Sequence, residues 1–277
     1  AIRDCFRFDP KVFRNTELIY SDETGQAVKD LGFEGIYVDG IESLLRGASA
    51  NQVYAHPSGG MILFPRNYKL SDDIAFRYSD PTWSEWPLTS ETFLRWINQM
   101  PSSAFTCLGM DYETLGEHQK RTGGILEFME GLLTGLAQQK RISFINPSEA
   151  QGKIMPVATL SAQGTISWAD HERDVSAWLG NEMQRDAFDS LRKLLPKIVR
   201  SADSKLLRDC RYLQTSDHFY YMSTKGGSDG QVHQYFSPYN SPYEAFMNYM
   251  NVLSDIAYRL KTGELKTALN TAIGTAL

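Results

Sequence analysis

The chain has 277 residues and a formal net charge of −5, with 42% hydrophobic and 22% charged residues. This composition excludes wholesale disorder, and a mildly acidic chain lacks the basic excess that non-specific nucleic-acid binding requires. It contains no apolar run near the roughly 18 residues of a membrane span and no signal-peptide pattern, so we expect no membrane association.

The first half of the chain alternates predicted strands with predicted helices. Short apolar runs indicate strands at 16–20, 33–38, 60–65, 105–110 and 141–145. Helical patterns occupy 22–31, 71–78, 90–99 and 124–139. Gly32 is expected to end the first of these helices and Thr89 to cap the third. Because this alternation is typical of a parallel sheet or barrel, the sequence predicts an α/β fold over residues 1–165.

The second half reads as mainly helical. Helical patterns cover 182–200, 203–214 and 242–261, and loops rich in Gly, Ser and Pro are expected at 223–230 and 236–242. We therefore expect residues 166–277 to form an all-helical C-terminal region.

The three cysteines, Cys5, Cys107 and Cys210, are odd in number and widely spaced. That pattern is unlike a disulfide framework and favours a reducing, cytoplasmic compartment. The histidines lack metal-ligand spacing, and no nucleotide-binding or serine-hydrolase motif is present. The sequence therefore implies no metal and no cofactor.

Two carboxylates, Glu17 and Asp111, follow or end predicted strands. Catalytic groups gather at the carboxyl ends of strands in parallel β/α architectures, where loops shape a pocket. The alternative is that Asp111 caps the following turn and that Glu17 is an exposed position on an edge strand. A frequency of 12% aromatic residues suits a sugar-binding cleft, but it suits an aromatic-rich core as well.

Five segments carry a resemblance that bears on these alternatives. Val-Phe-Arg-Asn-Thr-Glu-Leu-Ile-Tyr at 12–20 and Met-Asp-Tyr-Glu-Thr-Leu-Gly-Glu-His-Gln at 110–119 contain the two carboxylates; the others lie at 66–77, 213–222 and 237–246. Together they closely resemble glycoside hydrolase family 57, in its α-amylase-like branch. The resemblance extends from about residue 10 to about residue 262.

The resemblance implies a catalytic (β/α)7 barrel followed by a helical region that completes the cleft. It also implies a retaining α-amylase or glucanotransferase that acts on α-1,4-glucans, with Glu17 as the nucleophile and Asp111 as the general acid/base. Retention requires two carboxyl groups about 5–5.5 Å apart and no metal. On this basis we expect an α-glucan or maltooligosaccharide as the substrate.

Four other residues are candidate substrate contacts. His118 could bind a sugar hydroxyl or pack its own loop, and Asp217 and His218 could contact substrate or cap a helix. Trp178 could be a sugar platform or a core residue. Arg14 lies three residues before Glu17, and side chains share a face of a strand only at even spacing, so pairing between them is not expected.

The chain also departs from the family pattern. The His-Gln strand and the Gly-x-x-His-type segment that precede the nucleophile strand in the family are not found, since only residues 1–16 come before Glu17. We therefore expect a partial barrel. Such a barrel would have to close differently, associate with another copy through its open sheet edge, or be complemented by a missing segment. The alternative function is a catalytically inactive glucan-binding or structural relic.

Overall fold

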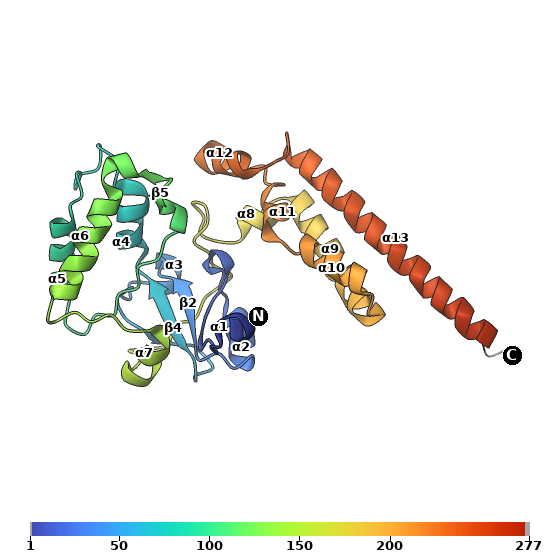
Figure 1. Cartoon of the computed structure of the whole chain (residues 1–277), viewed down its shortest axis with the longest axis horizontal. Coiled ribbons are helices and arrows are strands. Elements are labelled where there is room, and N and C mark those ends of the chain that lie inside the picture. The colour runs from blue at the N-terminus through green and yellow to red at the C-terminus, as the bar shows by residue number, and fades with distance from the viewer. Residues whose placement is uncertain (1, 275–277) are drawn as a thin grey trace. The chain divides into compact units, whose positions relative to one another are not determined.

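The structure is a computed structural model that describes residues 2–274, except for the side chains of residue 151 and residues 264–274. It divides into two compact units, Ala1–Trp168 and Ala169–Leu277, close to the boundary expected at residue 165. Figure 1 shows a sheet with helices in the first unit and helices in the second. Among the described residues, no helix combines the length and the apolar character of a membrane span.

The first unit is built on a four-stranded sheet in the order β1-β2-β4-β3. Its strands are β1 (Val12–Arg14), β2 (Gly35–Asp39), β3 (Tyr54–Ala55) and β4 (Ile62–Arg66). β1, β2 and β4 run parallel, whereas β3 pairs antiparallel with β4. At the end of β4, Arg66 forms an isolated parallel bridge with Cys107. The carboxyl ends of three strands and of the segment at Cys107 therefore lie at one edge of the sheet.

The helices of the first unit are α1 (Ile2–Phe6), α2 (Asp22–Asp30), α3 (Glu42–Leu45), α4 (Tyr68–Asp72), α5 (Ser90–Asn98), α6 (Ile125–Gln138) and α7 (Pro147–Lys153). α4 continues directly into a π-helical turn at Asp73–Arg77, and β5 (Leu115–Gly116) pairs with β6 (Gln119–Lys120). Gly32 has a φ of 90° after α2, and the Thr89 side chain caps α5, so both expected helix boundaries are confirmed.

Three apolar clusters stabilise this unit. One packs around β2 and includes Tyr20, Ile36 and Val38, and another joins Val53, Ile62, Phe64 and Ala150. The third lies among α4, α5 and α6, with α5 and α6 side by side in Figure 1. Burying one such large apolar side chain contributes roughly 1.5–3 kcal/mol, so the clusters hold the strand ends in place.

The first unit differs from the expected barrel. Its described residues form the open sheet above, and a (β/α)7 barrel is not confirmed. The strand expected at 16–20 is wrong, because β1 ends at Arg14 and Thr16–Leu18 is a 3₁₀ turn. Asn15 starts that turn by accepting a hydrogen bond from the Thr16 N–H, and Glu17 and Leu18 then take positive φ angles of 52° and 49°.

Two further predicted strands are also wrong. The run at 105–110 contains an isolated bridge at Cys107 but no strand, and the run at 141–145 belongs to no strand. Ile142 packs with the α5–α6 cluster, and Phe105 and Ile145 pack with the cluster at Phe64. Their apolar character reflects side-chain burial, which an apolar run alone does not distinguish from strand pairing.

The second unit contains α8 (Ser176–Leu179), α9 (Glu182–Ser201), α10 (Ser204–Leu213), α11 (Ser216–Tyr220), α12 (Gly227–Phe236) and α13 (Pro242–Gly274). Its expected helical character is confirmed. A capping box between Asn181 and Gln184 begins α9, and α9 and α10 pack against α13 (Figure 1). The loop expected at 223–230 is wrong in its second half, because α12 begins at Gly227.

Candidate active site

Glu17 and Trp168 make the most direct contact of the candidate site. Glu17 is half-buried in the turn after β1, and its carboxylate Oε2 accepts a hydrogen bond from the Trp168 indole N–H at 2.7 Å. A donor this close to a carboxylate oxygen fixes the direction of the side chain. Glu17 therefore lies beyond the end of β1, in a turn that presents its side chain to a residue much later in the chain.

The segment ending at Trp168 is paired with the turn at Glu17. Tyr20 and Ile166 form an antiparallel bridge with N–H to carbonyl distances of 2.9 and 2.8 Å. The Ser167 hydroxyl and the Trp168 N–H both donate to the Glu17 carbonyl at 3.0 Å. These bonds hold the Glu17 backbone in its left-handed conformation, which costs an ordinary side chain free energy.

Two guanidinium groups lie over the Trp168 ring. The Arg14 and Arg66 Cζ atoms are 4.9 and 5.1 Å from the ring centroid. Cation–π contacts of this kind contribute about 0.5–2 kcal/mol. They place positive charge next to the indole that holds Glu17. Arg14 therefore contacts the ring that binds Glu17. The even spacing at which side chains share a face of a strand does not apply to this pair, because Glu17 lies in a turn.

Arg66 is the centre of a buried charge cluster. It is 4% exposed, and its Nη1 and Nη2 donate to Asp39 Oδ1 at 3.0 Å and Asp72 Oδ1 at 2.5 Å. Its Nε donates to the Gly109 carbonyl at 2.6 Å. Asp39 and Asp72 are 0% and 5% exposed, so the cluster is screened little by solvent.

Asp39 and Arg66 were not singled out from the sequence. A signal for them existed, because each is a charged residue just after the end of a predicted strand, as Asp111 is. No comparable signal pointed to Trp168, which lies in a stretch without periodicity.

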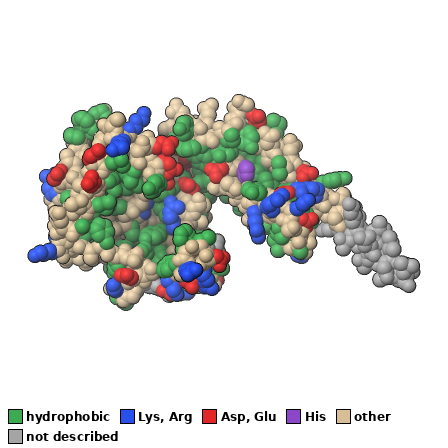
Figure 2. Space-filling view, in the orientation of Figure 1, with side chains coloured by type: hydrophobic (Ala, Val, Ile, Leu, Met, Phe, Trp, Pro, Cys, Tyr) green, Lys and Arg blue, Asp and Glu red, His purple; other side chains and the backbone are tan. Residues whose placement is uncertain are grey.

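A cleft of about 780 Å³ opens in the first unit, and Asp111 and Trp168 line it together with Arg14, Leu18 and Arg66. Most of the other lining side chains are apolar, among them Ile74, Ile97, Met100, Phe105, Met110, Leu132 and Ile142. Hydrophobic side chains also reach the surface over much of the face of this unit drawn in Figure 2. Asp111 itself is exposed.

Two groups in the cleft wall stay neutral near pH 7. Burial raises the pKa of the Tyr37 hydroxyl to about 12. Burial also raises the pKa of the Cys107 thiol to about 12. The charges that border the cleft therefore come from residues such as Arg14 and Arg66 and not from these two side chains.

Comparison with known proteins decides the family. The model of glycosyl hydrolase family 57 matches residues 1–163. The chain belongs to glycosyl hydrolase family 57. A Methanocaldococcus jannaschii protein named "Putative alpha-amylase" is 42% identical over 270 residues, which is 94% of this chain and 57% of that protein.

Solved structures of low sequence identity share the fold of this chain. A branching enzyme from Pyrococcus horikoshii has a TM-score of 0.65 at 14% identity, covering 94% of this chain and 63% of that one. A 4-alpha-glucanotransferase from Thermococcus litoralis has a TM-score of 0.53 at 14% identity, covering 79% and 40%. The chain thus spans less than two thirds of the length of these relatives.

Of the other predicted contacts of this family 57 chain, His118 is not among the residues that line the cleft, and the remaining three belong to the second unit. His118 is exposed between β5 and β6, and its backbone N–H donates to the Glu113 carbonyl at 3.0 Å. In α11 of the second unit, Asp217 is exposed, and the His218 Nε2 lies 3.1 Å from the Tyr212 carbonyl. Trp178, in α8, is 7% exposed and packs on Tyr220. Substrate contact by these four residues stays a prediction.

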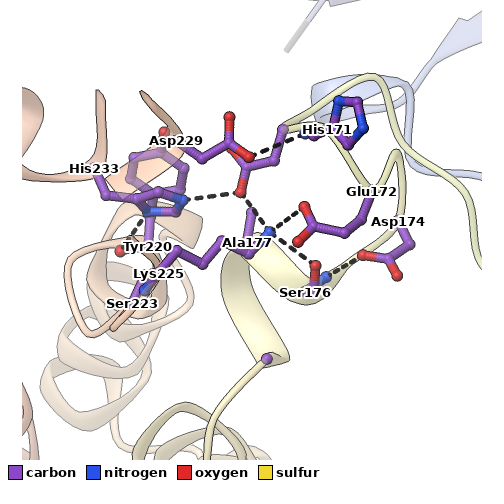
Figure 3. Close-up of polar contacts among 12 residues, drawn as sticks. His171, Glu172, Asp174, Ser176, Ala177, Tyr220, Ser223, Lys225, Asp229 and His233 are labelled. Atoms are coloured by element: carbon purple, nitrogen blue, oxygen red, sulfur yellow. Dashed lines mark hydrogen bonds and ion pairs between the residues drawn. The ribbon is translucent and has the colours of Figure 1, made fainter. Parts of the chain in front are cut away.

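In the second unit, three carboxylates could hold a metal ion. Oxygens of Asp170, Glu172 and Asp229 lie within 4.8 Å of one another. The Lys225 ammonium pairs with Asp170 and Glu172 at 2.7 Å each, so one cation is already shared between two of them (Figure 3). The His233 Nε2 lies 2.9 Å from Asp170 Oδ2. This arrangement is an ion-pair network that a metal would have to displace.

Proposed function

We propose that this chain carries the catalytic carboxylates of a retaining enzyme acting on α-1,4-glucans, of the α-amylase or glucanotransferase type. Glu17 is the nucleophile and Asp111 the general acid/base. The observation that carries this proposal is the hydrogen bond from Trp168 to Glu17 beside the cleft that Asp111 lines. The family and the relative named as an alpha-amylase support the substrate class.

The chemistry needs only these two carboxyl groups. Asp111 gives its proton to the glycosidic oxygen while the Glu17 carboxylate forms a bond to the anomeric carbon, and the leaving sugar departs as an alcohol. Asp111 then takes a proton from water, whose oxygen attacks the same carbon and releases Glu17. When a sugar hydroxyl replaces water, the second step transfers the glucan. Relatives named as a branching enzyme and a glucanotransferase support the transfer variant as well.

Release of reducing ends from maltoheptaose tests the proposal. We expect Glu17→Gln and Asp111→Asn each to lower the rate by several orders of magnitude, because each removes a group that acts at the reacting centre. Glu113→Gln is the matched control, since Glu113 is an exposed glutamate in the turn directly after Asp111. Its rate should stay within about two- to threefold of the original chain, as expected for a group outside the chemistry.

A folded chain that releases no reducing ends and transfers no glucan would contradict the enzyme proposal. Binding of maltooligosaccharides by that same chain, measured by calorimetry, would then support a catalytically inactive glucan-binding relic. Equal loss of rate in Glu113→Gln would show that the assignment of the two carboxylates is wrong.

A further inference from the structure

We infer that Trp168, held by Arg66, positions Glu17 and couples it to the chain segment that carries Asp111. This inference rests on the proposed function for its catalytic meaning. Trp168 and Arg66 are positioning residues in it, since each acts through another residue and not on the substrate.

The first link fixes the carboxylate of Glu17. Its Oε2 accepts the Trp168 indole N–H at 2.7 Å, and its carbonyl accepts the Trp168 N–H at 3.0 Å. Trp168 thus binds both the side-chain carboxylate and the backbone carbonyl of Glu17. The indole is rigid and has a single N–H donor, so the direction of the carboxylate follows directly from the orientation of the ring.

The second link fixes the ring of Trp168. The Arg66 Cζ lies 5.1 Å from the ring centroid. All three Arg66 nitrogens donate to protein acceptors, on Asp39, Asp72 and Gly109. Arg66 is therefore unable to turn away from the indole without breaking bonds inside a buried cluster.

The third link reaches Asp111. Arg66 Nε donates to the Gly109 carbonyl at 2.6 Å, and the Gly109 N–H donates to the Ser71 hydroxyl at 3.1 Å. Both backbone groups of a residue two positions before Asp111 are thus held by the Arg66–Ser71 segment. A single guanidinium group contacts the ring that orients Glu17 and the backbone that leads to Asp111. A retaining mechanism depends on the separation of two carboxyl groups, so such a link is well placed to maintain it.

A nuclear magnetic resonance measurement tests the contact without any substrate. The chain has 5 tryptophans, so the ¹H–¹⁵N spectrum contains one indole N–H signal for each. Trp168→Phe identifies its signal by loss. We expect that signal to move in Glu17→Gln, which removes the charge of the acceptor, and in Arg66→Lys, which removes the planar group over the ring.

Kinetics with maltoheptaose test the catalytic meaning. Trp168→Phe keeps an aromatic ring and removes the N–H donor, so we expect kcat to fall by about 10–100-fold with KM changed less than about threefold. Trp83→Phe is the matched control, since Trp83 also lies under a guanidinium, that of Arg77 at 5.7 Å, and does not line the cleft.

The two measurements separate failure of the inference from failure of the proposed function. A Trp168 signal that stays in place in Glu17→Gln would overturn the inference whether or not the chain is active. An equal fall in kcat for Trp83→Phe, or an unchanged kcat in Trp168→Phe, would overturn it as well. Absence of turnover in the original chain would contradict the proposed function, and the indole signal would still decide whether Trp168 positions Glu17.

Discussion

Asp39 and Arg66 form an ion pair in which both side chains are buried. The Arg66 Nη1 donates to Asp39 Oδ1 at 3.0 Å, and the two side chains are 5% and 0% exposed. They stand at the ends of neighbouring parallel strands, with Asp39 paired to Arg66 in the register of β2 and β4. Asp72 shares the same guanidinium at 2.5 Å. A single arginine, Arg66, therefore pairs with both of these buried carboxylates at the end of the sheet that borders the cleft.

Replacing that arginine should destabilise the first unit strongly. Arg66→Met leaves Asp39 and Asp72 as buried carboxylates without their cation, and removing one member of a buried pair costs about 3–5 kcal/mol. Urea unfolding measures the loss in the free energy of unfolding. Arg77→Met is the control, because the Arg77–Asp73 pair is partly exposed at 38% and 13% and should change that free energy by less than about 1 kcal/mol. Equal effects of the two substitutions would contradict the special role of Arg66.

The stereochemistry of azide rescue should assign the roles of the two carboxylates. With an α-linked substrate carrying a good leaving group, Glu17→Ala with azide should give a β-glycosyl azide, because azide attacks directly in a single inverting step. Asp111→Ala with azide should give an α-glycosyl azide, because azide then attacks the glycosyl-enzyme formed on Glu17. Product anomers identified by nuclear magnetic resonance check this. Exchanged anomers would reverse the assignment, and Glu113→Ala should give no azide product.

The parallel course of two neighbouring strands, whose ends carry Asp39 and Arg66, could be predicted from the sequence. Strands that alternate with helices run parallel, so groups at their carboxyl ends meet. The conformation at Glu17 could not be predicted. The run at 16–20 has the apolar and β-branched character of a strand, yet a side chain–backbone bond from Asn15 turns it. Such local competition outweighs a short strand preference.

The partner of Glu17 was beyond prediction for a different reason. Trp168 lies 151 positions away along the chain, in a stretch of bends and isolated bridges without periodicity. Its position depends on backbone pairing at Tyr20 and Ile166, which leaves no pattern in either segment. The sheet also has fewer strands than the sequence predicts. The apolar residues at 105–110 and 141–145 pack against other side chains and do not form strands.

The cysteines should differ in their reactivity with iodoacetamide at pH 8.5. Burial raises the pKa of the Cys107 thiol to about 12, so almost none of it is the reactive thiolate at that pH. Cys5 is exposed and should be alkylated first, whereas Cys107 should react only as the pH approaches its raised pKa or as the chain unfolds in urea. Peptide mass spectrometry over time measures both. Alkylation of Cys107 as fast as that of Cys5 in the folded chain would contradict its burial.

Acid should lower the stability of the second unit by protonating Asp170. Burial acts to raise the pKa of this carboxyl, but hydrogen bonds from His233 and Lys225 outweigh it, so the pKa is lowered from its ordinary value. A group with a lowered folded pKa contributes stability above its unfolded value, about 3.9, and loses it as the pH falls through the folded pKa.

Asp170→Asn should therefore lower the free energy of unfolding of the second unit at pH 6 and make that free energy less dependent on pH below about 4. Unfolding in urea, followed by circular dichroism, measures both. Asn is a matched substitution because Asp170 has a φ of 52°, a left-handed conformation that Asn also tolerates. Asp189→Asn is the control, since the Asp189–Arg192 pair is exposed at 51% and 73% and should contribute little. An acid transition unchanged by Asp170→Asn would mean that another carboxylate controls it, and the network around Lys225 would then be a minor part of the stability of this unit.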